Sequence, residues 1–188
     1  MRLFVAVELS DEARRAVASE QERLRTLLGA SASGLRWVQP EHLHLTMVFL
    51  GEIDERRVPP VVEAVERPAA AAPFTMSLGG IGVFPARGAP RAVWIAVGEG
   101  KDPLIRVQQE IAGRLAAAGV VLDDRPFNPH LTLARWKDGG KGADRRRLTE
   151  GSGGTVARTE VTSVTLFQSR LSSTGPTYTP LARTPLNP

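Results

Sequence analysis

The tripeptide His-Leu-Thr occurs twice in the sequence, at residues 44–46 and 130–132. Each copy opens an apolar run typical of a β-strand, the first ending at Leu50 and the second at Trp136. Residues i and i+2 of a strand share a face, so each histidine stands beside its threonine, about 6 to 7 Å along the strand. The two leucines point to the opposite face, into the core. The repeat therefore predicts two rigid strands that each present one imidazole and one hydroxyl group.

The segments before the two tripeptides follow the same order of strand, amphipathic helix and loop. Residues 3–9 stand to the first tripeptide roughly as residues 92–97 stand to the second. Ser10 can cap the first helix, and Asp102-Pro103 is typical of a cap followed by proline at the first helical position. We therefore expect a duplicated unit whose two histidine strands face each other across a cleft.

In the rest of the chain, the apolar patterns that predict strands are weaker. Apolar alternation predicts a strand over residues 74–78, with a glycine-rich connection from there to Phe84. A strand is also expected at residues 120–122. Residues 161–168 and 177–181 predict two more strands, joined by a turn at 172–175. The proline-rich residues after 181 predict a tail without regular structure.

Composition narrows the chemistry. The sequence has no cysteine, which excludes disulfides, thiolate catalysis and cysteine-ligated zinc, and suggests a reducing cytoplasm. The net charge is +4, and lysine occurs only at residues 101, 137 and 141, so nearly all the positive charge is arginine. Because the arginine fork binds phosphate in a bidentate manner, this favours an anionic partner. A composition bias of the gene would explain the arginines equally well.

Two imidazoles on either side of one phosphorus suit phosphodiester hydrolysis. One ring removes a proton from the attacking water and the other protonates the departing oxygen, and the ordinary histidine pKa of about 6.5 allows one ring of each kind near neutral pH. We therefore predict His44 and His130 as the catalytic residues. Thr46 and Thr132 can donate hydrogen bonds to the non-bridging phosphate oxygens, and Arg135 can add a cationic fork. This chemistry requires no metal or other cofactor.

Two alternatives remain open. His42 could pair with His44 as a metal-binding H-x-H motif, but neither repeat offers a carboxylate at a matched position, and the second copy has Asn128 where the first has His42. We therefore expect His42 to be a strand-entry residue. The second alternative is an RNA-end-binding module that keeps the basic cleft without catalysis.

Other motifs complete a pattern that resembles a known family. They are Arg2-Leu3-Phe4-Val5-Ala6-Val7, Arg36-Trp37-Val38, Phe49-Leu50-Gly51, Phe84-Pro85, Pro129 before and Ala134-Arg135 after the second tripeptide, Ser169, Gly175-Pro176 and Tyr178. With the two tripeptides, they resemble the two-histidine phosphoesterases, and within them the bacterial and archaeal RNA 2′,3′-cyclic phosphodiesterases of LigT type, once called 2′-5′ RNA ligases. The resemblance covers essentially the whole chain.

The resemblance implies an α+β fold over residues 1–188 as a single bilobal domain, in which each lobe has an antiparallel sheet flanked by helices and a cleft lies between the lobes. It implies hydrolysis of RNA 2′,3′-cyclic phosphate ends to a 2′-phosphomonoester, with 2′-5′ ligation as a possible reverse reaction. His44 would protonate the departing 3′ oxygen and His130 would activate water. Thr46 and Thr132 would bind phosphate, and Arg135 would contact phosphate or nucleotide. We expect the partners to be RNA ends, such as those of tRNA fragments, or small nucleotides. We also expect a monomer that does not associate with a membrane.

Overall fold

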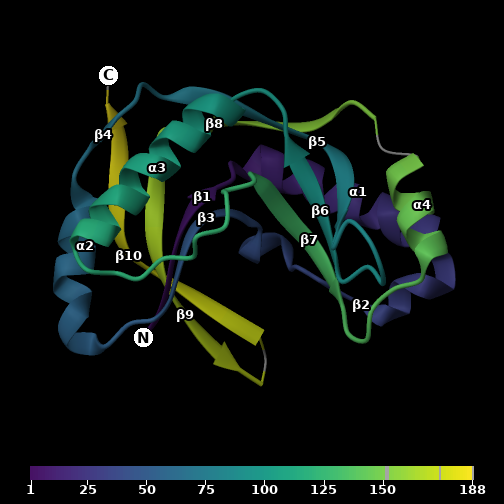
Figure 1. The fold of residues 1–188 in the computed structure, drawn as a ribbon. Coiled ribbons are helices and arrows are strands. Elements are labelled where there is room, and N and C mark those ends of the chain that lie inside the picture. The colour runs from purple at the N-terminus through teal and green to yellow at the C-terminus, as the bar shows by residue number, and fades with distance from the viewer. Residues whose placement is uncertain (151–152, 174, 188) are drawn as a thin grey trace.

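The structure is a computed structural model that describes residues 1–150, 153–173 and 175–187 (Figure 1). Its strands are β1 (Arg2–Glu8), β2 (Leu35–Trp37), β3 (His44–Glu52), β4 (Ala69–Ala70), β5 (Phe74–Phe84), β6 (Ala92–Val97), β7 (His130–Trp136), β8 (Thr155–Val161), β9 (Ser163–Ser172) and β10 (Gly175–Asn187). Its α-helices are α1 (Asp11–Leu28), α2 (Val58–Glu66), α3 (Lys101–Ala117) and α4 (Gly142–Glu150), with short 3-10 turns at Gly29–Gly34, Pro40–His42 and Glu55–Arg57. In the described residues, no helix is long and apolar enough to span a membrane.

The strands form two five-stranded sheets, in the orders β3-β1-β9-β10-β4 and β2-β7-β6-β5-β8. All pairs are antiparallel except β10 with β4. Helices α2 and α3 pack on the first sheet, and α1 and α4 pack on the second (Figure 1). Strands β3 and β7, which open with the two tripeptides, occupy matching places beside β1 and β6. The predicted α+β architecture with duplicated antiparallel sheets is confirmed.

Each sheet takes strands from both halves of the chain. Strands β9 and β10 extend the sheet that contains β1 and β3, while the short β2 crosses to the edge of β7 in the second sheet. Helix α1 lies against β8 of the second sheet, and α3 lies against β3 and β4 of the first. The two halves are therefore interleaved.

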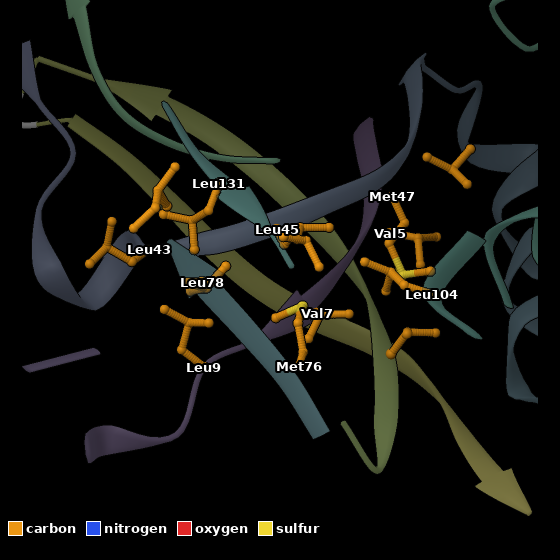
Figure 2. Close-up of a cluster of buried hydrophobic side chains, with 14 of the residues drawn as sticks. Val5, Val7, Leu9, Leu43, Leu45, Met47, Met76, Leu78, Leu104 and Leu131 are labelled. Atoms are coloured by element: carbon orange, nitrogen blue, oxygen red, sulfur yellow. The ribbon is translucent and has the colours of Figure 1, made fainter. Parts of the chain in front are cut away.

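One apolar core joins the two sheets (Figure 2). The central leucines of both tripeptides, Leu45 and Leu131, are 0% exposed and belong to it. Val5 and Val7 enter the same core from β1. Because successive residues of a strand point to opposite faces, burial of these leucines turns His44 and His130 to the faces that lead away from the core.

The first helix forms as the sequence predicts. Ser10 lies just before α1, and its hydroxyl oxygen accepts a hydrogen bond from the backbone N–H of Ala13 at 3.2 Å. Asp11 and Glu12 occupy the first turn, where negative charge is favourable. The helix ends at Leu28, and Gly29 provides the positive φ of 55° at its C-cap.

The cap predicted for α3 is wrong. The helix begins at Lys101, one residue before Asp102, and the capping position is Gly100 with a φ of +80°. A side chain at Gly100 would meet the backbone oxygen of Thr75 at 2.4 Å, so this close approach places the cap at a glycine. Asp102 instead lies in the first turn of the helix.

Three other sequence predictions are wrong in part. The glycine-rich run after residue 78 continues β5 through a register shift, and residues 120–122 form no strand. The residues expected to form a tail are the second half of β10. Proline is tolerated on this strand because β10 pairs with β4 only at Leu186 and Asn187, which leaves the rest of that edge free of ladder hydrogen bonds. The turn predicted at 172–175 includes residue 174, which lies outside the described residues.

Replacing Leu45 with alanine should lower the free energy of unfolding by about 2–5 kcal/mol, since it removes a fully buried side chain and leaves a cavity. Urea denaturation followed by circular dichroism measures this change. The matched control is Leu171→Ala, because Leu171 is 69% exposed; we expect less than about 0.5 kcal/mol there. Equal effects of the two substitutions would show that the tripeptide leucine is not an anchor.

Candidate active site

The two tripeptide histidines each form a hydrogen bond of the same kind, from the ring to a backbone carbonyl two residues earlier. In His44, the Nδ1–H donates to the backbone carbonyl of His42 at 2.7 Å, and in His130 it donates to the carbonyl of Asn128 at 2.7 Å. A carbonyl can only accept, so Nδ1 carries the proton in both rings. The Nε2 atom is then the nitrogen that remains to accept or donate a proton in each copy.

Strands β3 and β7 lie against each other although they belong to different sheets. His44 and His130 are the first residues of these strands, and both are partly buried. Thr46 and Thr132 follow two residues later on the same faces, also partly buried. The predicted pairs of imidazole and hydroxyl are therefore present on both strands.

A bulge follows each tripeptide at the same position. Across β1 and β3, Ala6 faces Thr46 and Val5 faces Val48, so one residue of β3 is left without a partner. Across β6 and β7, Trp94 faces Thr132 and Val93 faces Ala134, with the same omission. A bulge shifts the alternation of side chains by one residue.

The shift decides where the residue five positions after each histidine points. Without a bulge, Phe49 and Arg135 would lie on the face opposite the histidines; with it, both return to the histidine face. Phe49 is 51% exposed, and Arg135 is also exposed. The sequence spacing alone placed Arg135 near His130 without a reason, and the bulge supplies one.

Aromatic rings surround each imidazole. The His44 ring lies 4.9 Å from the Phe4 ring and 5.2 Å from the Tyr178 ring, measured between centroids. The His130 ring lies 5.1 Å from Phe84 and 5.9 Å from Trp94. Each histidine ring is therefore flanked by two aromatic side chains, which form its aromatic walls.

These walls are built into the strands. Phe4, Ala6 and Phe167, with Tyr178 packed on them, form a small apolar cluster separate from the main core. On the other sheet, a Cβ atom at Gly82 would come within 2.1 Å of the Trp94 ring, so only glycine leaves room for that ring beside His130.

Two polar side chains of α1 hold the backbone around the tripeptides. The guanidinium group of Arg14 donates to the carbonyls of Leu9, Pro40 and Glu41, which fixes the turn before His44. The amide of Gln21, which is 2% exposed, donates to the carbonyl oxygens of Val38 and Leu133 at 2.9 Å each. Leu133 is the residue that the bulge leaves without a partner on β6, and its carbonyl accepts hydrogen bonds from both the Gln21 amide and the backbone N–H of Val38. Gln21 therefore holds the backbone at the bulge.

Burial lowers the pKa of His44 below the ordinary value of 6.5. The hydrogen bond to the His42 carbonyl acts in the opposite direction, and the nearby His42 ring adds a smaller lowering effect. The free protein therefore favours neutral His44. A bound phosphate beside Nε2 would favour the protonated ring, because an opposite charge stabilises the charged form.

The hydroxyl group of Tyr178 is affected by charged side chains from both sheets. Burial raises the pKa of its hydroxyl, while the positive charges of Arg2 and Arg135 act to lower it. Arg2 lies on β1 and also sits over the Phe49 ring, 5.2 Å from its centroid. Arg135 lies on β7 of the other sheet, so its charge reaches across to the first sheet.

A cavity of about 330 Å³ opens beside His44. Phe4, Phe167 and Tyr178 supply its aromatic lining, and Glu8 supplies a carboxylate that accepts hydrogen bonds from Thr165 and Arg183. Sequence reasoning did not single out Phe4 or Tyr178 as site residues. Their contacts with His44 depend on strand pairing across more than 100 positions in the case of Tyr178, and no local pattern reveals that pairing.

His42 occupies the short turn Pro40–His42, with its ring 5.1 Å from the Tyr178 ring. Its backbone carbonyl orients His44, which is consistent with the predicted strand-entry role. Among the residues that the structure describes, no group of three or more His, Cys, Asp or Glu side chains is arranged to hold a metal ion.

Comparison with known proteins places the chain beside phosphoesterases. The family model for "LigT like Phosphoesterase" matches residues 7–94 and 95–178. An Archaeoglobus fulgidus protein named RNA 2′,3′-cyclic phosphodiesterase is 37% identical over 180 residues, covering 95% of this chain and 96% of the relative. A Thermotoga maritima protein of the same name is 30% identical over 180 residues, covering 95% and 91% of the two chains.

A solved structure agrees with these relatives. The crystal structure of E. coli LigT in complex with 3′-AMP matches with a TM-score of 0.80 and 27% identity, covering all of this chain and 98% of that one. The two segments matched by the family model also agree with the duplication that the sequence predicts.

We expect the His44 ring to titrate below the ordinary pKa of about 6.5 in phosphate-free buffer, because burial disfavours its charged form. Nitrogen-15 NMR of the imidazole atoms measures the midpoint and should also show the proton on Nδ1 in the neutral ring. Inorganic phosphate should raise the midpoint. A His42→Asn variant leaves only two histidines to assign. A midpoint at or above 6.5 without phosphate would contradict the prediction.

Proposed function

The chain belongs to the LigT-like phosphoesterase family, and from this premise we propose that it hydrolyses 2′,3′-cyclic phosphates at RNA ends to 2′-phosphomonoesters. The observation that supports the proposal most strongly is the matched pair of histidines, each with Nδ1–H bound to a carbonyl two residues earlier. Both rings are thereby oriented to use Nε2, and both strands add a threonine hydroxyl beside it.

In the proposed reaction, neutral His130 accepts a proton from water through Nε2 as the water oxygen attacks phosphorus. Protonated His44 donates its Nε2 proton to the 3′ oxygen as the bond between phosphorus and that oxygen breaks. The products are a 2′-phosphate and a 3′-hydroxyl group, and the enzyme is left with His130 protonated and His44 neutral. Exchange of one proton with solvent at each ring restores the starting state.

The lowered pKa of His44 fits this cycle only if substrate binding protonates the ring. We propose that the phosphate anion does so, which couples the acid to the presence of substrate. Thr46 and Thr132 donate hydrogen bonds to the non-bridging oxygens, where negative charge develops. Arg135 contacts a phosphate or the nucleotide of the substrate. The assignment of His44 as acid and His130 as base follows the family pattern.

The aromatic walls assist by limiting water around the imidazoles. With less bulk water nearby, the hydrogen bonds from threonine and the charge of Arg135 act at a lower effective dielectric constant. Every step uses side chains of this chain, and none uses a metal. The same groups serve the microscopic reverse, so joining of a 2′,3′-cyclic end to a 5′-hydroxyl end is a secondary proposal.

We further propose that residues 1–188 act as one unit and as a monomer. The interleaving of β2, β9 and β10 between the sheets supports the single unit, because neither half of the chain can complete a sheet alone. The two histidines then come from opposite halves of one chain.

Removal of either catalytic histidine should abolish most activity. We expect His44→Ala and His130→Ala each to lower kcat by about 10² to 10⁴, because each loses one proton-transfer group. The assay follows hydrolysis of adenosine 2′,3′-cyclic phosphate with EDTA present. His42→Asn keeps the backbone carbonyl that orients His44 and should lose far less activity.

Three results would contradict the proposal. Wild-type rates retained in either alanine variant would remove the two-histidine mechanism, and loss of wild-type activity on chelation would favour a metal site at His42 and His44. Tight, salt-sensitive binding of RNA ends without any product would instead identify the protein as an end-binding module.

A further inference from the structure

Two arginines lie directly opposite each other across β2 and β7. The register pairs Leu35 with Trp136, Arg36 with Arg135 and Trp37 with Ala134. Residues paired in this way share a face of the sheet, with Cβ atoms about 4.5–5.5 Å apart. Leu35 and Trp136 are buried, whereas Arg36 and Arg135 are exposed. The two guanidinium groups therefore project together from the same face.

That face is the one that presents His130. On the other side of β7, strand β6 pairs Ala96 with His130, Trp94 with Thr132 and Ala92 with Arg135. Because these three β6 residues are each two apart, they share one face, and so do their partners. The arginine pair thus lies about 7 Å along the sheet from Thr132, on the same surface.

The pair is not neutralised within the protein. Like charges directly opposite each other across a sheet are destabilising. In the described part of the chain, neither Arg36 nor Arg135 forms an ion pair or a side-chain hydrogen bond, whereas Arg158 and Arg183 each bind a glutamate. Two adjacent unpaired guanidinium groups beside a phosphate-handling site favour a second anion.

We propose that Arg36 and Arg135 bind the phosphodiester that precedes the terminal nucleotide of the RNA. This inference rests on the proposed function and specifies its substrate: an RNA end with a phosphate on the 5′ side of the last nucleoside, in preference to a nucleoside cyclic phosphate. Arg36 reaches this position because β2 crosses from the first half of the chain to the edge of the second sheet. Binding of the upstream phosphate relieves the repulsion within the pair.

The proposal can be tested by binding, without turnover. Adenosine 2′-monophosphate carries only the product phosphate, while adenosine 2′,5′-bisphosphate adds the phosphate that stands for the upstream phosphodiester. Isothermal titration calorimetry at low salt should show that the wild type binds the bisphosphate about tenfold or more tightly. In Arg36→Gln, this gain should largely disappear while affinity for the monophosphate stays unchanged. Arg36→Lys should give an intermediate gain, because it keeps the charge but loses the fork.

Arg106→Gln is the matched control, since it removes one exposed positive charge from α3, a helix that packs on the first sheet. It should retain the full gain from the 5′-phosphate. An undiminished gain in Arg36→Gln, an equal loss in Arg106→Gln, or no gain in the wild type would overturn the proposal. So would an equal loss of affinity for both ligands in Arg36→Gln, because Arg36 would then contact the reacting phosphate.

Two further measurements separate a folding defect, or failure of the proposed function, from failure of this proposal. Arg36→Gln should unfold at a temperature no lower than the wild type, because it removes a like-charge pair. If Arg36→Gln unfolds at a lower temperature than the wild type, the binding measured with Arg36→Lys tests the proposal instead. A gain in affinity from the 5′-phosphate as large as that of the wild type would then overturn the proposal. Hydrolysis of adenosine 2′,3′-cyclic phosphate by the wild type tests the proposed function by itself. If that reaction proceeds, the kcat/KM of Arg36→Gln should fall only for a dinucleotide that ends in a cyclic phosphate.

Discussion

Burial of Leu45 and Leu131 in one core fixes the direction in which everything else on β3 and β7 points. Both side chains are 0% exposed, and both lie in the cluster that joins the two sheets. A slip of one residue in either strand would bring a histidine into this core and a leucine into the cleft, at a large cost in free energy. The hydrophobic effect therefore sets the register of the site, and the hydrogen bonds from Nδ1 refine it.

The strands that carry His44 and His130 have the same bulged geometry, but the residues around the two rings differ. The matched bulges return Phe49 on one strand and Arg135 on the other to the histidine face. Burial lowers the pKa of His44, and a cavity opens beside that ring. Duplication thus supplies two equivalent imidazoles, while their neighbours differentiate them. The lowered pKa of His44 alone favours the neutral ring, so the acid role proposed for His44 depends on its protonation by the bound phosphate.

The sequence predicts the features that depend on neighbouring residues. The repeat and period-two spacing place His44, His130 and the threonines, and Ser10 caps α1 as expected. Pairing between distant strands is not encoded in any local pattern. Sequence reasoning therefore missed the bulges, the contact of Tyr178 with His44 and the position of Arg36 opposite Arg135. The cap at Gly100 was missed because it depends on the backbone near Thr75, on another strand. The catalytic roles remain predictions.

We propose that His44 and His130 act on one phosphorus as acid and base respectively. The most direct test replaces the departing 3′ oxygen of the cyclic phosphate with sulfur, because a thiol pKa of about 8.5 lets the thiolate leave without a proton donor. We expect His44→Ala, severely impaired on the oxygen substrate, to regain most of its rate on the sulfur substrate, whereas His130→Ala should stay impaired. Equal rescue of both variants, or rescue of His130→Ala alone, would contradict it.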